Sequence, residues 1–269
     1  MAILLTDLTA HADLIGNLVV RDLKTRYRGS VLGLLWTLLN PLFMAAIYIF
    51  FLTLLSRDIA SQYEHIIIGV FAWQFTVQCI NAGMNAITGN ASLVKKVYFP
   101  RMILPLSVNL SALANFWLTL IVQWVLLFAI LAVTKHDTPR LLTLWVPLLS
   151  LYHLVFNLSL SLLVAAANVF FRDTQHLVGL LLSAWFFMSP VMYPLEMVER
   201  VAAGHPWIAQ VYMLNPMTAI LTAYRALQVP GTVFPWTAAS VAGLLLPVAL
   251  IAVAIRVFQR TQRAFSDLL

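Results

Sequence analysis

Long apolar runs separated by short polar loops dominate the chain, and they predict membrane-spanning helices. The first run, Val31–Leu55, contains no charged residue. At about 1.5 Å of rise per residue, a run of this length crosses the ~30 Å hydrocarbon core of a bilayer. The pattern therefore predicts an all-α integral membrane protein with six transmembrane helices in a single transmembrane domain, residues 1–269. The predicted spans are residues 31–55, 66–91, 102–133, 141–171, 177–193 and 237–255.

Residues 8–28 precede the first span and predict an amphipathic helix on the membrane surface. The segment is too polar to cross the bilayer, so its cations would face water or lipid phosphates. An ordinary cytosolic helix is the alternative. Asp22 and Arg26 depart from the polar stripe of this helix, but they are four residues apart and can form an ion pair. The stripe recurs at steps of three and four residues: Asp13, Asn17, Arg21, Lys24 and Arg28.

Residues 195–229 fit neither a membrane span nor a soluble loop. They divide into three short, largely apolar or amphipathic pieces, separated by Gly204-His205-Pro206 and Asn215-Pro216. Pieces that are too short to cross a bilayer, and that are broken by turn-forming residues, indicate re-entrant or interfacial helices. A folded cap outside the membrane is the alternative interpretation.

A short basic segment, residues 93–100, separates the second and third predicted spans. It holds Lys95 and Lys96, followed by Tyr98 and Phe99. Cations beside a span follow from membrane topology, but topology does not require two aromatic side chains on a polar turn. We therefore interpret this segment as a surface where a partner contacts the chain.

Composition and charge place the chain in a membrane and orient it. Only 10% of the 269 residues are charged and 62% are hydrophobic, whereas soluble domains are about 25% charged. Eleven of the 16 Lys and Arg residues fall on the side of the two termini. Because positive charge accumulates on the cytoplasmic side, we predict that both termini are cytoplasmic. The net charge of +6 follows from this topology, and we expect no nucleic-acid partner.

The predicted spans carry amides and aromatic rings in place of central charges. A carrier coupled to protons or sodium usually keeps an ionisable residue there, so a secondary transporter is disfavoured, although His153 leaves a small opening for one. Amides beside aromatic rings suit a hydroxyl-rich, sparsely charged cargo, but such amides also join helices to one another within membranes. The candidate residues of a translocation path are Trp36, Asn40, Tyr48, Phe71, Gln74, Phe75, Gln78, Asn81, Asn85 and Tyr193.

No motif of an enzyme or of a metal site accompanies these residues. The sequence has no Gly-rich phosphate loop, no pair of zinc-binding histidines at helical spacing and no Cys/His cluster. We expect no catalytic residue, metal or cofactor in this chain. If ATP drives transport, ATP and magnesium would be bound by a partner subunit. A membrane-embedded glycosyl or acyl transferase is an alternative of another class, and it would act on a sugar lipid without an ATPase.

Four separated stretches resemble the type-2 ABC exporter permeases, and within them the exporters of O-antigen, capsule and teichoic acid polysaccharides. The resemblance covers nearly the whole chain. The stretches are Arg21–Trp36 with Asn40-Pro41-Leu42, Tyr98–Arg101 with Leu104-Pro105, Ser189–Pro194, and Leu214–Met217 with Tyr224-Arg225.

The resemblance implies a function and a set of partners. It implies a homodimer in the bacterial inner membrane, paired with two cytosolic ATPase subunits, that exports a polysaccharide linked to a polyprenyl diphosphate lipid. An exporter of a small drug or lipid, or of teichoic acid, is the alternative. Residues 93–100 would form a coupling helix, and Arg21, Arg26 and Arg28 would lie near the entrance for the lipid diphosphate. The residues expected to couple to the ATPase are Lys95, Lys96, Val97, Tyr98, Phe99, Pro100, Arg172 and Asp173.

Overall fold

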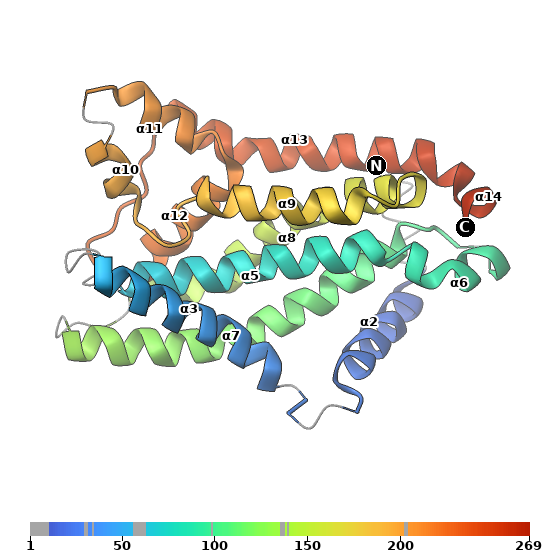
Figure 1. Cartoon of the computed structure of the whole chain (residues 1–269), viewed down its shortest axis with the longest axis horizontal. Coiled ribbons are helices and arrows are strands. Elements are labelled where there is room, and N and C mark those ends of the chain that lie inside the picture. The colour runs from blue at the N-terminus through green and yellow to red at the C-terminus, as the bar shows by residue number, and fades with distance from the viewer. Residues whose placement is uncertain are drawn as a thin grey trace.

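The chain folds into a bundle of long helices with shorter helices at both ends (Figure 1). The computed structural model describes residues 11–29, 32–33, 35–55, 63–97, 99–134, 138, 140–201 and 204–269, and every regular element within these ranges is a helix. The predicted all-α membrane fold is thereby confirmed. The α-helices are α2 (Ala12–Tyr27), α3 (Leu35–Leu55), α5 (Tyr63–Asn85), α6 (Ala91–Lys96), α7 (Ile103–Thr134), α8 (Val146–Phe170), α9 (Thr174–Phe187), α10 (Leu195–Val201), α11 (Pro206–Met213), α12 (Pro216–Gln228), α13 (Ala238–Thr261) and α14 (Phe265–Leu268).

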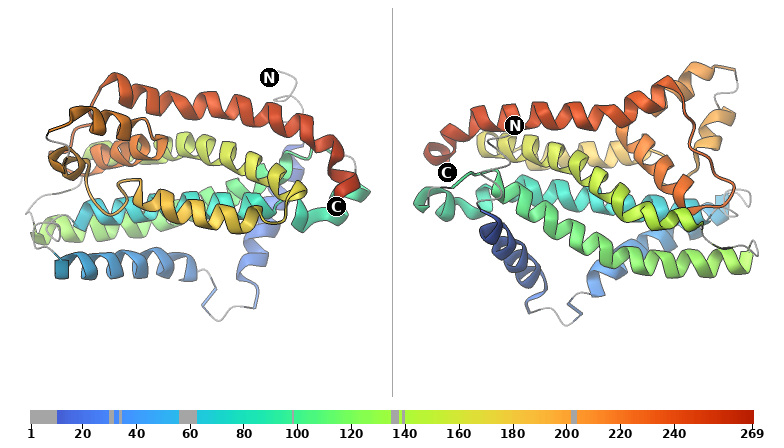
Figure 2. Two further views of the ribbon diagram at one scale, coloured as in Figure 1. Left: turned by 45° about the horizontal axis from the view of Figure 1, so that its top comes forward. Right: turned by 180° about the vertical axis from the view of Figure 1, so that it is seen from behind.

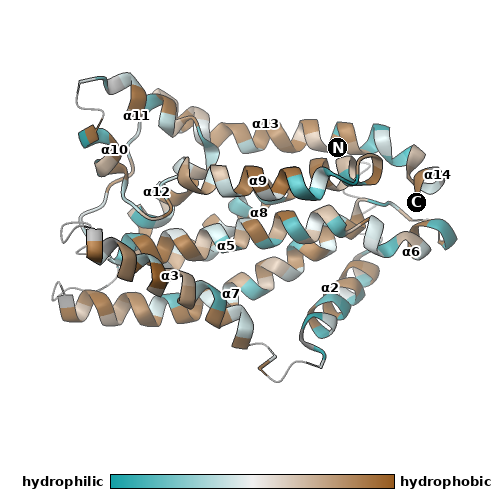
Figure 3. Cartoon of the chain, in the orientation of Figure 1, coloured by the Kyte–Doolittle hydropathy of each residue, from teal (hydrophilic) through white to brown (hydrophobic). Residues whose placement is uncertain are grey.

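Four helical segments of the described residues are long and apolar enough to cross a membrane: Tyr63–Asn85, Ile103–Val133, Leu141–Phe170 and Ala238–Ala264. The apolar helices α3 and α9 occupy the places of the first and fifth predicted spans, but they are shorter, so a count of six spans stays a prediction. Large apolar side chains are exposed along α7, α9 and α13, and Figure 3 shows these helices mostly in the hydrophobic colour. Contiguous exposed apolar surface of this kind is typical of contact with lipid or with another protein.

Helix α5 lies at the centre of the bundle and contacts α3, α7, α8, α9 and α12. Small residues let it approach α8 closely, because a Cβ atom on Gly83 would lie 2.4 Å from the Cβ atom of Ser161. The Ser161 hydroxyl also donates a hydrogen bond of 2.9 Å to the Cys79 carbonyl. Close packing around small residues is how membrane helices gain contact without a hydrophobic driving force.

Several helices end at residues other than the predicted span boundaries. Helix α9, for example, covers Thr174–Phe187 where residues 177–193 are predicted, and α13 continues to Thr261 where the predicted span ends at residue 255. Helix α5 ends at Asn85, before the predicted boundary at residue 91, because a 3-10 turn, Thr88–Asn90, separates it from α6. The region of the fourth span begins with a 3-10 helix, Leu141–Trp145, and α8 follows with a proline in its first turn. A proline in the first turn loses no helical hydrogen bond, so it marks the start of a helix.

The short helices gather at the two ends of the bundle. Figure 2 shows α10, α11 and α12 at one end, and α6, α14 and the turn between α8 and α9 at the other. Helix α2 packs against α7 and projects from the side of the bundle at the second end (Figure 2). The segments in which the sequence predicts most of the cytoplasmic cations therefore lie together in space.

Candidate functional site

Four amide residues, Gln74, Gln78, Asn81 and Asn85, recur at helical spacing along one side of α5. Part of this amide stripe borders a groove between α3 and α9. The groove has a volume of about 360 Å³, and α5 lends it Gln74 and Asn81. Tyr48 of α3 forms part of its wall. Amide and phenol groups beside aromatic walls can exchange hydrogen bonds with hydroxyl groups and stack on apolar sugar faces. The remaining lining residues are Met44, Val70, Trp73, Val77, Gly179, Leu182, Ser183, Phe186 and Phe187.

A smaller cavity of about 110 Å³ lies next to the groove, and Gln74 lines both. Its lining includes the predicted residues Asn40, Phe71, Phe75 and Gln78. Phe71 and Phe75 are buried in the core of the subunit, and the Phe75 ring stacks on Phe116 with the ring centres 4.6 Å apart. Of the predicted rings, Tyr48 is therefore the one that borders the larger groove.

Three predicted path residues lie outside both spaces. Trp36 is exposed near the start of α3. The side-chain oxygen of Asn85 accepts a hydrogen bond of 3.0 Å from Gln175, which ties the end of α5 to the start of α9. Tyr193 lies beyond α9, where its hydroxyl donates to the Phe187 carbonyl at 2.8 Å. The three residues thus border neither the groove nor the smaller cavity, and their roles in transport stay predictions.

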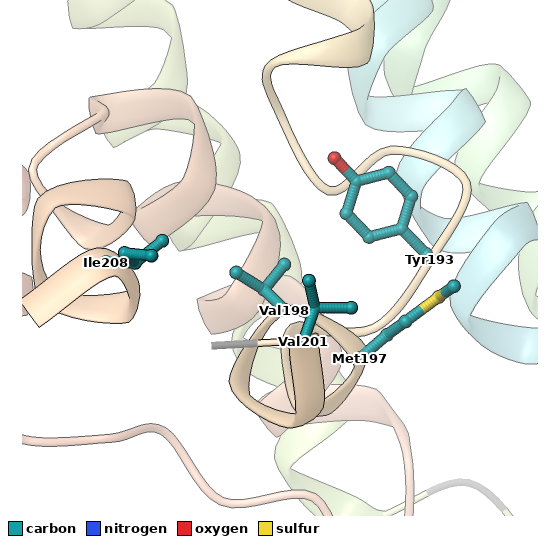
Figure 4. A pocket seen from close by; sticks show the side chains of 5 residues that line it. All are labelled: Tyr193, Met197, Val198, Val201 and Ile208. Atoms are coloured by element: carbon teal, nitrogen blue, oxygen red, sulfur yellow. The ribbon is translucent and has the colours of Figure 1, made fainter. Parts of the chain in front are cut away.

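Tyr193 borders an apolar cavity of about 260 Å³ between α10 and α11. Figure 4 shows its ring beside Met197, Val198 and Val201 of α10, with Ile208 of α11 across from them. Its hydroxyl also lies 2.5 Å from that of Tyr212. Tyr193 thus joins the turn after α9 to the short helices.

Two of the sequence stretches used in the family resemblance meet at the start of α12. The Asn215 side chain accepts hydrogen bonds from the Met217 backbone and from the Trp185 indole, each at 3.1 Å. Its amide nitrogen donates to the Ser189 hydroxyl at 2.9 Å. Asn215 therefore caps α12 and fastens it to the turn after α9, with Pro216 in the favoured first position of the helix.

Arg225 forms a buried link that the sequence alone does not indicate. Its side chain is 2% exposed, and its NH2 group donates to the carbonyls of His65, Pro190 and Val191 at 2.9, 2.5 and 3.1 Å. These acceptors belong to the start of α5 and to the turn after α9. A guanidinium has five donors in a planar fork, so one side chain can join three segments of chain.

His153 has partners on both ring nitrogens. Nε2 lies 2.8 Å from the Thr76 hydroxyl, and Nδ1 lies 3.4 Å from the Tyr224 hydroxyl. The residue is fully buried. A buried histidine with a hydrogen-bonding neighbour at each ring nitrogen fits a structural role in the bundle.

Buried amides elsewhere in the bundle join helices to one another. Gln123 of α7 donates to the Gln228 side chain of α12 at 2.7 Å. Asn168 of α8 donates to the Met84 carbonyl of α5 at 3.0 Å. Amides of this kind stabilise the bundle, whereas Gln74 and Asn81 face the groove. The structure therefore shows amides that join helices, while the role of Gln74 and Asn81 in a translocation path stays a prediction.

Helix α6 and the residues directly after it have one side facing solvent and one side facing the core of the subunit. Lys95, Lys96 and Val97 are exposed, with Val97 at 50%. Val94 and Phe99 pack in a second core cluster of the subunit. The inward placement of Phe99 leaves the exposed residues as the surface that a partner could reach. Tyr98 lies outside the described residues.

The turn between α8 and α9 is the second predicted coupling segment. Arg172 and Asp173 are exposed there, and the Phe171 side chain before them is 71% exposed. The predicted coupling residues do not include Phe171, because the sequence placed it at the end of the fourth span. An aromatic residue directly before a charged turn is the signal that could have identified it.

Helix α2 carries a basic hollow of about 350 Å³, lined by residues that include Arg21, Lys24 and Arg28. Arg21 also donates a hydrogen bond of 2.7 Å to the Asn90 side chain, directly before α6. Arg26 instead pairs with Asp22 at 3.1 Å, as predicted from their spacing. The three predicted arginines therefore separate into two at the hollow and one neutralised by its neighbour.

Comparison with known proteins places this architecture in a family. Residues 13–229 match the family described as ABC-2 type transporter. The chain is 36% identical over 225 residues to an O-antigen export system permease protein RfbA of Myxococcus xanthus, with 83% of each chain covered. It is 32% and 30% identical to two proteins of the same name from Klebsiella pneumoniae, with 82% and 81% of each chain covered. The chain belongs to the ABC-2 type transporter family.

Proposed function

We propose that the chain is the permease subunit of an ATP-driven exporter that moves a polyprenyl-diphosphate-linked polysaccharide, of O-antigen or capsular type, out of the cytoplasm. The observation that carries the proposal is the similarity, over more than four fifths of the chain, to three proteins named as O-antigen export permeases. The groove beside α5 supports it, because its amides and rings suit a hydroxyl-rich cargo.

The path through the membrane would be completed by a second copy of the chain. In one subunit, the groove lies at the side of α5 between α3 and α9 and is bordered by exposed residues such as Asn81 and Phe187. A homodimer with two such grooves facing each other would enclose a channel with amides on both walls. Symmetric dimers are the commonest assembly of identical subunits.

The energy would come from two copies of a cytosolic ATPase subunit, which would bind ATP and magnesium. The chain would contact this subunit through the exposed side of α6 and through Phe171, Arg172 and Asp173. Val97 and Phe171 supply apolar contact surface, and Lys95 and Lys96 supply charge. Interfaces commonly combine an apolar centre with a charged rim.

The basic hollow of α2 is proposed as the entrance for the lipid diphosphate. Arg21 and Arg28 line it, and Arg26 lies on the same helix in its pair with Asp22. Phosphate groups attract juxtamembrane cations by about 1 kcal/mol for each Lys or Arg near an anionic surface. This placement requires that α2 lie on the cytoplasmic face of a bacterial inner membrane, with both termini cytoplasmic.

The proposal is tested by deleting the gene and restoring it. We expect the deletion strain to lack long polysaccharide on its surface and to accumulate lipid-linked glycan in the cytoplasmic leaflet. The restored gene should reverse both effects. Long polysaccharide on the surface of the deletion strain would contradict the proposal. Stimulation of the ATPase by a small amphiphile, with none by lipid-linked glycan, would instead favour an exporter of small molecules.

The groove is tested by Gln74→Leu combined with Asn81→Leu, which removes two amides at similar volume. If each amide contributes one hydrogen bond of about 1 kcal/mol to passage of the glycan, the export rate falls roughly tenfold or more. The matched control is Thr53→Val, because the Thr53 hydroxyl bonds to the Ile49 carbonyl of its own helix and lies outside the groove. If the double variant and the control export glycan at the same rate, Gln74 and Asn81 do not contribute to the translocation path.

A further inference from the structure

The two segments proposed to contact the ATPase are held together by the C-terminal segment, Gln262–Leu268. This segment comprises a 3-10 turn and α14, and it follows α13 directly. Helix α14 contacts both α6 and α8. Figure 1 shows α14 beside α6, at the end of the bundle where α8 passes into α9. The C-terminal segment therefore lies against both halves of the proposed coupling surface.

Phe265 is the residue through which the C-terminal segment packs. Its side chain is fully buried, and its ring contacts Phe258 of α13 and Phe170 of α8, with centres 5.4 and 6.2 Å apart. It shares a core cluster with Val94 of α6 and with Phe99 of the loop after α6. Phe170 directly precedes the exposed turn that begins with Phe171. One aromatic ring thus contributes to the support of both segments.

A polar contact reinforces the same connection. The Arg101 guanidinium, directly after the α6 loop, donates a hydrogen bond to the backbone carbonyl of Gln262. Gln262 is the C-terminal cap of α13, where the last carbonyls of a helix lack partners and attract positive charge. Arg101 therefore ties the loop after α6 to the end of α13.

We propose that Phe265 and the C-terminal segment position α6 against the end of α8, so that the two ATPase-facing segments move as one body. Helix α6 has only six residues, too few to be stable without packing. Without the buried ring beneath it, α6 would yield locally when pushed, and less of the ATPase movement would reach the spanning helices. The coupling role rests on the proposed function, whereas the positioning of α6 does not.

The direct test is hydrogen exchange of the backbone amides of α6 in the complete permease–ATPase complex in lipid nanodiscs. We expect Phe265→Ala to speed exchange in residues 91–97 by about tenfold, because local opening governs exchange. Phe265→Leu keeps an apolar side chain and should restore most of the protection. Leu268→Ala is the matched control, since Leu268 is an exposed apolar residue of the same helix. Unchanged exchange in a folded Phe265→Ala complex, or an equal change in the control, overturns the proposal.

The second readout is the amount of glycan exported per ATP hydrolysed. Phe265→Ala should lower this ratio about fivefold while hydrolysis continues, within the range by which single mutations alter coupling. A parallel loss of hydrolysis and export in a complex that still assembles would show a purely structural role for Phe265 and contradict the coupling role. Faster amide exchange in α6, with an unchanged amount of glycan exported per ATP, would also contradict the coupling role.

Arg101→Gln and the exchange measurement provide tests that do not depend on Phe265→Ala or on the cargo. If Phe265→Ala fails to assemble, Arg101→Gln replaces it, because this change removes the bond to Gln262 and leaves the aromatic cluster intact. Unchanged α6 exchange in Arg101→Gln then overturns the proposal. If the wild-type complex exports no glycan, the proposed cargo is wrong, whereas the exchange measurement still decides whether the C-terminal segment holds α6.

Discussion

Arg225 keeps a charge inside the protein because backbone carbonyls replace the water around it. Desolvation lowers the pKa of its guanidinium to about 10, so the group stays protonated at neutral pH. Its bonds to the carbonyls of His65, Pro190 and Val191 bring together the start of α5, the turn after α9 and α12. The residue thus fixes the position of the short helices relative to the bundle.

Replacing Arg225 should destabilise the chain. Arg225→Met removes three hydrogen bonds from a charged donor and leaves buried carbonyls unpaired, which we expect to cost roughly 3 kcal/mol or more. Arg225→Lys keeps the charge but lacks the planar fork, so it should recover only part of the loss. The measurement is the apparent Tm of the purified chain in detergent. Arg200→Met, at an exposed position on α10, is the control, and an equal Tm for the two Met variants would contradict this role of Arg225.

Gly69 is a second residue whose importance depends on a contact distant in sequence. A Cβ atom at this position would lie 2.0 Å from the Val191 carbonyl oxygen and 2.9 Å from the Arg225 NH2 group. Gly69→Ala should therefore displace the turn after α9 and lower the Tm. Gly16→Ala is the control, because nothing lies within 4 Å of its Cβ position in α2. Alanine favours a helix over glycine by about 1 kcal/mol, so Gly16→Ala should leave the Tm unchanged or raise it. A lower Tm for Gly69→Ala alone supports the steric explanation.

At the scale of elements, the cations that the sequence of α2 presents as one polar stripe have different surroundings in the structure. Arg21 is tied to Asn90 before α6, while Lys24 and Arg28 line the hollow. Arg26 is engaged with Asp22. On the proposed function, the hollow would bind phosphate, while Arg21 ties α2 to the residue before α6.

Neutralising the hollow should weaken the response to anionic lipid. We expect Lys24→Gln combined with Arg28→Gln to reduce binding of lipid diphosphate by roughly tenfold or more at low salt, since each cation near an anionic surface contributes about 1 kcal/mol. The difference from wild type should shrink as salt screens the charges. Binding can be measured with the complete exporter in nanodiscs. Arg26→Gln is the comparison. If it loses as much lipid-diphosphate binding as the double variant, the lipid diphosphate does not bind specifically at the hollow.

At the scale of the whole molecule, the two ends of the bundle differ in chemistry. The α6 and α14 end holds the exposed segments that we propose to contact the ATPase, while the opposite end holds α10, α11 and their apolar cavity (Figures 1 and 4). A protein that receives force at one end and releases cargo at the other requires such an asymmetry. The orientation in the membrane is the prediction that follows.

Cysteine labelling checks this orientation. Cys79 is the only cysteine and is fully buried, so the native chain should react little with a charged thiol reagent. Ser266→Cys on α14 should be labelled only after the cytoplasmic face is opened, and Glu196→Cys on α10 should be labelled in intact spheroplasts. Both positions are exposed. The reverse labelling pattern would show that the chain has the opposite orientation in the membrane.

The sequence by itself determined the helices and their order. Apolar length, proline and charge are local properties, so the short helices of residues 195–229 could be anticipated within a few residues. The same local signals predicted the pair of Asp22 and Arg26, because a helix brings residues four apart together.

Only the tertiary structure decided which polar and aromatic residues share a site. Gln74 and Asn81 reach the groove while Asn168 joins helices, and all three are amides in predicted spans. Phe99 turned inward to the subunit core, beside a Phe265 that lies 166 positions later in the chain. Such choices depend on contacts between residues far apart in sequence, which a local pattern of hydrophobic and polar positions does not encode.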